Sequence, residues 1–61
     1  MTATPLPDRL RALQAHLGKS NPQMARQFHV ERGAWMKWKA GRKPSRVSLA
    51  AINDALRRAK L

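Results

Sequence analysis

The two tryptophans of this 61-residue chain lie three residues apart, at Trp35 and Trp38. Side chains at that spacing share one face of a helix. A chain of this length buries only about 60% of the surface that its unfolded form exposes, so a few large side chains must fill its core. We therefore predict a helix whose inner face carries both indoles. In the alternative, the two indoles stack on the bases of a nucleic acid.

The first half of the chain contains two stretches with the apolar spacing of a helix. A first helix is predicted over 7–17, and Gly18 just past its end suits the left-handed conformation. Ser20 and Gln23, three residues apart, form a capping box that starts a second helix. This second helix is short and runs to about Phe28.

The second half of the chain contains two more predicted helices, one on each side of a basic loop. The tryptophan helix is predicted from about 31 to 40, and the Gly- and Pro-containing segment "AGRKPS" ends it. Ser45 can cap a fourth helix. The apolar side chains expected to point largely inward from that helix are Val47, Leu49, Ile52 and Leu56. The sequence thus predicts an all-α fold, with one domain over 6–61 and a flexible arm over 1–5.

The charge of the chain is strongly one-sided. Thirteen Lys and Arg against three Asp and Glu give a formal net charge of +10. Such a density repels itself unless a polyanion is the normal partner, and nucleic acid is the first candidate. No apolar stretch approaches the roughly 18 residues of a membrane span, and the N-terminus lacks the pattern of a secretory signal. We therefore expect a cytoplasmic, nucleoid-associated protein with no membrane partner.

Several residues in fixed register resemble a known family over Leu6 to Leu56. The apolar and small positions that match are Leu10, Leu13, Met24, Ala25, Phe28, Val30, Trp35, Leu49, Ile52, Ala55 and Leu56. Ser20 matches a helix cap, and Trp38, Gly41, Pro44 and Ser45 match a "W…G…PS" segment. Together they resemble the phage repressor and Cro type (XRE-like) of helix-turn-helix domain. The resemblance implies a compact, lambda-repressor-like bundle of four short helices.

The resemblance also implies which residues contact DNA. In this geometry the second helix of the motif enters the major groove, and its outer face meets the base edges. Here that face carries the candidate base contacts Arg32, Gly33, Met36 and Lys37. The candidate phosphate contacts are Asn21, Arg42, Lys43 and Arg46. For Asn21, a helix cap is an equally good interpretation.

Three residues near the turn depart from the family pattern. His29 stands where a glycine in the left-handed conformation is usual. Glu31 replaces the usual Ser or Thr cap, and its carboxylate opposes a phosphate backbone. Gly33 weakens its helix by up to ~1 kcal/mol relative to Ala. The fifth helix that often contributes to dimer contacts in such domains is not matched here, so we expect Ala55, Ala59 and Leu61 to supply those contacts.

Other chemistries find little support in the sequence. His16 and His29 have no metal-ligand spacing, and the chain has no cysteine. The acids Asp8, Glu31 and Asp54 are scattered, and no serine has a convincing base beside it. We therefore expect no enzyme activity, no cofactor and no metal site.

The function predicted from the sequence is sequence-specific binding of double-stranded DNA. We expect a small phage or mobile-element repressor that blocks transcription by occupying a two-fold symmetric operator, as a weak homodimer formed largely on DNA. One alternative is an antitoxin-like or adaptor module that binds another protein. The other is a non-specific architectural or recombination accessory protein, which would bind all duplexes alike.

Overall fold

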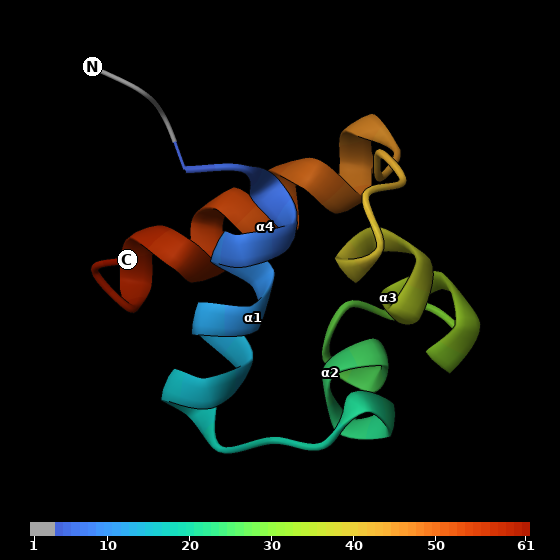
Figure 1. Cartoon of the computed structure of the whole chain (residues 1–61), viewed down its shortest axis with the longest axis horizontal. Coiled ribbons are helices and arrows are strands. Elements are labelled where there is room, and N and C mark those ends of the chain that lie inside the picture. Colours follow the sequence, from blue (N-terminus) through green and yellow to red (C-terminus); the bar gives the residue numbers. More distant parts are fainter. Residues whose placement is uncertain (1–3) are drawn as a thin grey trace.

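The computed structural model describes residues 4–61, which form four α-helices and no strand (Figure 1). The helices are α1 (Leu6–Leu17), α2 (Asn21–Gln27), α3 (Arg32–Lys39) and α4 (Arg46–Arg58). The prediction of an all-α bundle of four short helices is confirmed, with boundaries close to those expected. The predicted flexible arm falls on 1–5, of which residues 1–3 lie outside the described part of the chain.

Two groups of contacts hold the four helices together: those between α2 and α3, and those that α1 makes with α3 and α4. The helices α2 and α3 lie together, joined by a turn of four residues, in a helix-turn-helix arrangement (Figure 1). The first helix packs against α3 on one side and crosses α4 on the other. The orientation of α3 is therefore set mainly by its contacts with α1 and α2.

Local signals in the sequence fix the ends of the first two helices. Gly18 has φ +64° and donates its backbone N–H to the carbonyls of Ala15 and Gln14, which closes α1. The Ser20 hydroxyl accepts a hydrogen bond from the Gln23 backbone N–H at 3.4 Å, and the Gln23 side chain accepts one from the Ser20 backbone N–H at 2.9 Å. The predicted capping box at the start of α2 is therefore present.

The turn between α2 and α3 contains the strained residue that the sequence indicated. His29 has φ +57°, the left-handed conformation that side chains other than glycine adopt at a cost. The Val30 backbone N–H then donates to the Ala25 carbonyl at 2.9 Å. Glu31 occupies the N-cap of α3, but its side chain makes no capping hydrogen bond. The turn is thus held by backbone hydrogen bonds and by burial of its neighbours.

The core is a single cluster that all four helices contribute to. Its buried side chains are Leu10, Leu13, Met24, Ala25, Phe28, Trp35, Trp38, Ile52 and Leu56. The ring of Phe28 stacks on Trp35 with centroids 5.9 Å apart, and Trp38 meets Trp35 edge-on at 6.2 Å. Both tryptophans therefore face inward, as the sequence predicts, and they attach α3 to the rest of the domain.

One predicted core residue lies on the surface. Val47 is 81% exposed, whereas Ile52 and Leu56 on the same helix are fully buried. Nine residues separate Val47 from Leu56, which is about two and a half helical turns and places them on opposite faces. The prediction that Val47 points inward was wrong because its spacing does not match the buried stripe of α4.

We predict that Trp38→Ala unfolds the domain. Trp38 is only 6% exposed and contacts both other aromatic rings, so its removal leaves a large cavity. A loss of roughly 3–5 kcal/mol is of the same order as the whole stability of so small a domain. Far-UV circular dichroism during urea titration measures the effect. The control is Met36→Ala, on the outer face of α3 where Met36 is 45% exposed, and a Trp38→Ala protein as stable as this control would contradict the core assignment.

Candidate functional site

The outer face of α3 is a continuous exposed surface on a firmly anchored helix. Arg32, Gly33, Met36 and Lys37 are all exposed, and they lie on the face opposite the buried Trp35 and Trp38. The structure therefore brings together all four residues predicted to contact bases. A short helix with a buried aromatic face and an exposed polar face can enter a groove without disturbing its own packing.

Gly33 leaves the backbone of this face uncovered. A Cβ added at Gly33 would meet no atom within 4 Å, so the position is open rather than crowded. The packing of the domain therefore does not require a glycine here. What Gly33 provides is an exposed stretch of helix backbone between Arg32 and the next turn.

The basic segment after α3 continues this surface. Arg42, Lys43 and Arg46 are exposed. The Arg42 backbone N–H donates to the Lys37 carbonyl at 3.0 Å, and Gly41 has φ +117°, so the segment turns directly off the last turn of α3. Three of the four predicted phosphate contacts thus lie next to the exposed face of α3.

Two of the three acidic residues form ion pairs on α1 and α4, and the third, Glu31, is exposed at the N-cap of α3 beside Arg32. Asp8 pairs with Arg11 in α1, and Asp54 pairs with Arg57 and Arg58 in α4. The hydrogen bond from Arg57 and the charge of Arg58 lower the pKa of Asp54, which keeps this carboxylate ionised. Within residues 4–61 no ion pair involves a cation of α3 or of the loop that follows it. The positive charge of this surface is therefore not neutralised by the chain itself.

Asn21 differs from the other predicted phosphate contacts because it is half-buried and its side chain forms hydrogen bonds inside the domain. Ser20 is the N-cap of α2, and Asn21 is half-buried. Its Oδ1 atom accepts hydrogen bonds from Gln14 Nε2, Trp35 Nε1 and Lys39 Nζ, at 2.9, 3.1 and 3.0 Å. Its carbonyl oxygen therefore links three helices inside the domain. The N-cap is therefore Ser20 and not Asn21, whereas the predicted phosphate contact of Asn21 stays a prediction, because a phosphate would accept from its N–H groups and not from Oδ1.

The sequence interpretation missed Lys39 and Gln14, which form a polar network with Asn21. Lys39 is half-buried at the end of α3, and its Nζ donates to Gln14 Oε1 at 2.8 Å. The available signal was spacing, because Lys39 lies four residues after Trp35 and so shares its inner face. A lysine on an inward stripe indicates a polar contact inside the fold.

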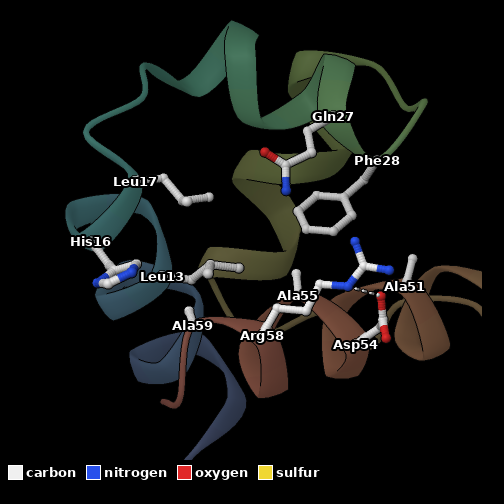
Figure 2. A pocket seen from close by; sticks show the side chains of 10 residues that line it. All are labelled: Leu13, His16, Leu17, Gln27, Phe28, Ala51, Asp54, Ala55, Arg58 and Ala59. Carbon is white, nitrogen blue, oxygen red and sulfur yellow. Dashed lines mark ion pairs between the residues drawn. The ribbon is translucent and has the colours of Figure 1, made fainter.

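The three residues predicted to form dimer contacts line two different hollows, and their role in a dimer stays a prediction. Ala55 and Ala59 are half-buried against the core and line a surface hollow between α1, the end of α2 and α4 (Figure 2). Phe28 forms part of this hollow, together with Leu17, which is 37% exposed. Leu61 is 47% exposed and lines a separate hollow beside Asp8, Arg9 and Ala12. A single contact surface can therefore include the two alanines without Leu61.

Neither a metal cluster nor a membrane span is found in the described chain. Residues 4–61 contain no group of three or more His, Asp or Glu side chains placed to hold a metal ion. In the same range, no helix has the length and apolar character needed to cross a bilayer. The exposed face of α3 and the basic segment beside it are therefore the strongest candidate site.

Comparison with known proteins adds no assignment to this site. The chain matches no protein-family model, no curated protein and no solved structure at a significant level. Inference about function therefore depends on the geometry and charge of the α3 surface.

Proposed function

We propose that this protein binds double-stranded DNA in a sequence-specific manner, with α3 in the major groove. The observation that carries the proposal is the exposed face of α3. On the opposite face Trp35 and Trp38 are buried in the core, and the segment that follows the helix contains cations that form no ion pair within residues 4–61. The major groove is about 12 Å wide and admits one α-helix. An exposed helix flanked by uncompensated positive charge fits that groove in shape and in charge.

The side chains of this face are suited to base edges. The guanidinium fork of Arg32 can donate two hydrogen bonds to guanine O6 and N7. Lys37 can reach a guanine or a phosphate, and Met36 can lie against a thymine methyl group. All three are exposed, so none has to leave a packed position to make such a contact. Gly33 allows the helix backbone to approach the DNA closely.

The basic segment is suited to the phosphate backbone. Arg42, Lys43 and Arg46 are exposed and unpaired within residues 4–61, and they lie at the end of α3 opposite Arg32. Such contacts position a protein on the duplex and carry no sequence information. Asn21 stays in the proposed set, because its Oδ1 atom accepts the internal hydrogen bonds whereas a phosphate would accept from its Nδ2 group or a backbone N–H.

The resemblance to phage repressor and Cro domains supports the same proposal. The short α2, the four-residue turn with left-handed His29, and the outward face of α3 match the expectations drawn from that family. A small DNA-binding domain of this kind regulates transcription mainly through the site that it occupies on DNA. We therefore propose that it acts as a repressor that occupies its operator and blocks polymerase, as in phage or mobile-element regulation, in a cytoplasmic, nucleoid-associated setting.

We further propose that two copies bind together on a symmetric operator. One helix in one groove reads too few base pairs to single out an operator among the competing sites of a genome. Ala55 and Ala59 in the hollow of Figure 2 offer a small contact area, whereas Leu61 lies apart from them. A small area and a charge of +10 on each chain favour a pair that forms largely on DNA.

Selection of bound duplexes from a random pool tests the main proposal. Enrichment of one sequence motif is the expected result. Equal recovery of all duplexes would instead support the architectural or recombination accessory role. Absence of any duplex binding at low salt would leave the antitoxin-like or adaptor role as the better explanation of this fold.

We predict that Arg32→Ala weakens binding to the selected duplex by roughly 1–3 kcal/mol and relaxes the preference at one base position. The matched control is Arg42→Gln, which also removes one positive charge. This control should weaken binding to all duplexes alike and reduce the magnitude of the salt slope by about one unit. Fluorescence anisotropy titrations at several salt concentrations measure both. An Arg32→Ala loss that is equal on every sequence would assign Arg32 to the phosphates.

We predict that Gly33→Ala stabilises the free protein and weakens DNA binding. The added methyl group meets no neighbour, and Ala is favoured in a helix by up to ~1 kcal/mol over Gly. In the complex, the same methyl group would collide with DNA that approaches the backbone closely. The control is Asn53→Ala on an exposed position of α4, which should also stabilise the helix but leave DNA binding intact. Unchanged affinity in Gly33→Ala would show that DNA does not approach this backbone.

We predict that half-site centres lie about 34 Å apart, which is one turn of the duplex. Inserting five base pairs between the half-sites rotates one of them to the far side of the DNA. Affinity should then fall to that of a single half-site. An insertion of ten base pairs, about one full turn, returns both half-sites to the same side of the duplex and serves as the control. Affinity that survives the five-base-pair insertion undiminished would exclude the symmetric pair.

A further inference from the structure

The ammonium group of Lys39 is held by neutral acceptors from two other helices. It donates to Gln14 Oε1 of α1 at 2.8 Å and to Asn21 Oδ1 of α2 at 3.0 Å. Lys39 is half-buried, and within residues 4–61 no carboxylate pairs with it. A cation in this setting loses part of its hydration without gaining an opposite charge.

The same end of α3 is tied down by two further contacts. Arg11 Nη2 donates to the Lys39 backbone carbonyl at 3.0 Å, which attaches the last turn of α3 to α1. The Nζ atom of Lys39 also lies 6.0 Å from the ring centre of Trp35, whose Nε1 donates to Asn21. Side chains of α1, α2 and α3 thus meet in one polar network, which we call the Lys39 network and which comprises Arg11, Gln14, Asn21, Trp35 and Lys39.

The other end of α3, which carries Arg32 and Gly33, is attached to the core mainly by apolar packing. Glu31 makes no capping hydrogen bond and Arg32 and Gly33 are exposed, whereas Trp35 is fully buried and Val30 packs against the core. Seven residues separate Lys39 from Arg32, a distance of about 10 Å along the helix axis. A rotation of about 10° at Lys39 would therefore move Arg32 by roughly 2 Å, more than a specific contact tolerates. A small change in the contacts of Lys39 would therefore alter the angle at which Arg32 is presented, even with Trp35 still buried.

Stability alone does not account for a lysine at this position. An apolar side chain of similar length would fill the same space without desolvating a charge, and such replacements are often neutral or stabilising. What the ammonium group adds is a set of directed hydrogen bonds to Gln14 and Asn21. Hydrogen bonds are directional, whereas the apolar packing around Trp35 is much less so.

We propose that Lys39 is a positioning residue, which holds α3 through Gln14 and Asn21 at the angle that specific DNA recognition needs, without itself contacting DNA. The inference rests on the proposed function. In this proposal the half-buried Lys39 affects the sequence specificity of DNA binding although it is not part of the exposed face of α3.

The test is a double-mutant cycle with Lys39→Met, Gln14→Met and the double variant. Methionine matches glutamine in length, is one atom shorter than lysine, and keeps helix propensity. Dissociation constants are measured for the selected duplex and for a scrambled duplex, over a range of salt concentrations. Lys60→Met is the control for the lost charge, because Lys60 is exposed and lies outside both the α3 surface and the Lys39 network.

Each single variant should reduce the preference for the selected duplex roughly tenfold, with affinity for the scrambled duplex and the salt slope unchanged. The double variant should lose less than the sum of the two single losses, because both variants remove the hydrogen bond between Lys39 and Gln14. Melting temperatures should shift by no more than about 8 °C. The Trp35 indole N–H resonance should move in both single variants, since this group donates to Asn21 within the network. Lys60→Met should keep the full preference.

Three results would overturn the inference. Equal weakening on both duplexes with a smaller salt slope would make Lys39 a phosphate contact. Retained preference in Lys39→Met, or purely additive losses in the double variant, would show that the network does not set the angle of α3. A wild-type protein with no preference for any duplex would overturn the proposed function, and this inference with it. Should Lys39→Met fail to fold, Gln14→Met alone decides, because it removes no charge and must still lower the preference.

Discussion

The packing of Phe28, Trp35 and Trp38 is the interaction on which the rest of this structure depends. A domain of this size has room for few buried side chains, so most of its apolar burial comes from a small number of large ones. Here the three rings interlock within 5.9–6.4 Å and join α2 to α3. Because both tryptophans lie on α3, the helix with the candidate binding face is also firmly attached to the core.

In this arrangement the outer face of α3 makes no contact with the core. Side chains there can be chosen for contact with a partner, since none of them packs inside the domain. The same separation holds for charge. The ion pairs of Asp8 and Asp54 lie within α1 and α4, whereas the cations of α3 and of the following loop stay unpaired in the described chain. The buried side of α3 therefore carries the packing, and its opposite side is the one that we propose for binding.

Aromatic packing resists separation of the helices but is weakly directional, whereas hydrogen bonds are strongly so. The polar contacts around Asn21 complement the aromatic cluster for this reason. Its single oxygen atom accepts from donors on α1 and α3, and it does so beside the indole of Trp35. The domain thus combines a core that supplies stability with a small polar network that specifies how α3 is oriented.

Most of the fold could be predicted from the sequence because its signals are local. The capping box at Ser20, the left-handed Gly18 and the inward pair of tryptophans all follow from spacing and backbone preference, whereas the left-handed His29 was indicated only by the family resemblance. The same periodicity also placed Arg32 and Lys37 on the outer face. Val47 shows the limit of this approach, because an apolar residue was assigned to the core without a check of its angle against Ile52 and Leu56.

What only the tertiary structure decided depends on contacts between residues distant in sequence. Asn21 and Lys39 are 18 residues apart, and Gln14 and Lys39 are 25 apart, so no local pattern indicates that they share a network. The separation of Leu61 from Ala55 and Ala59 is likewise a matter of how α4 packs against α1. The sequence by itself determined where each helix begins, ends and turns its apolar face. The tertiary structure decided which polar atoms meet, because the relative placement of helices is a collective result of packing.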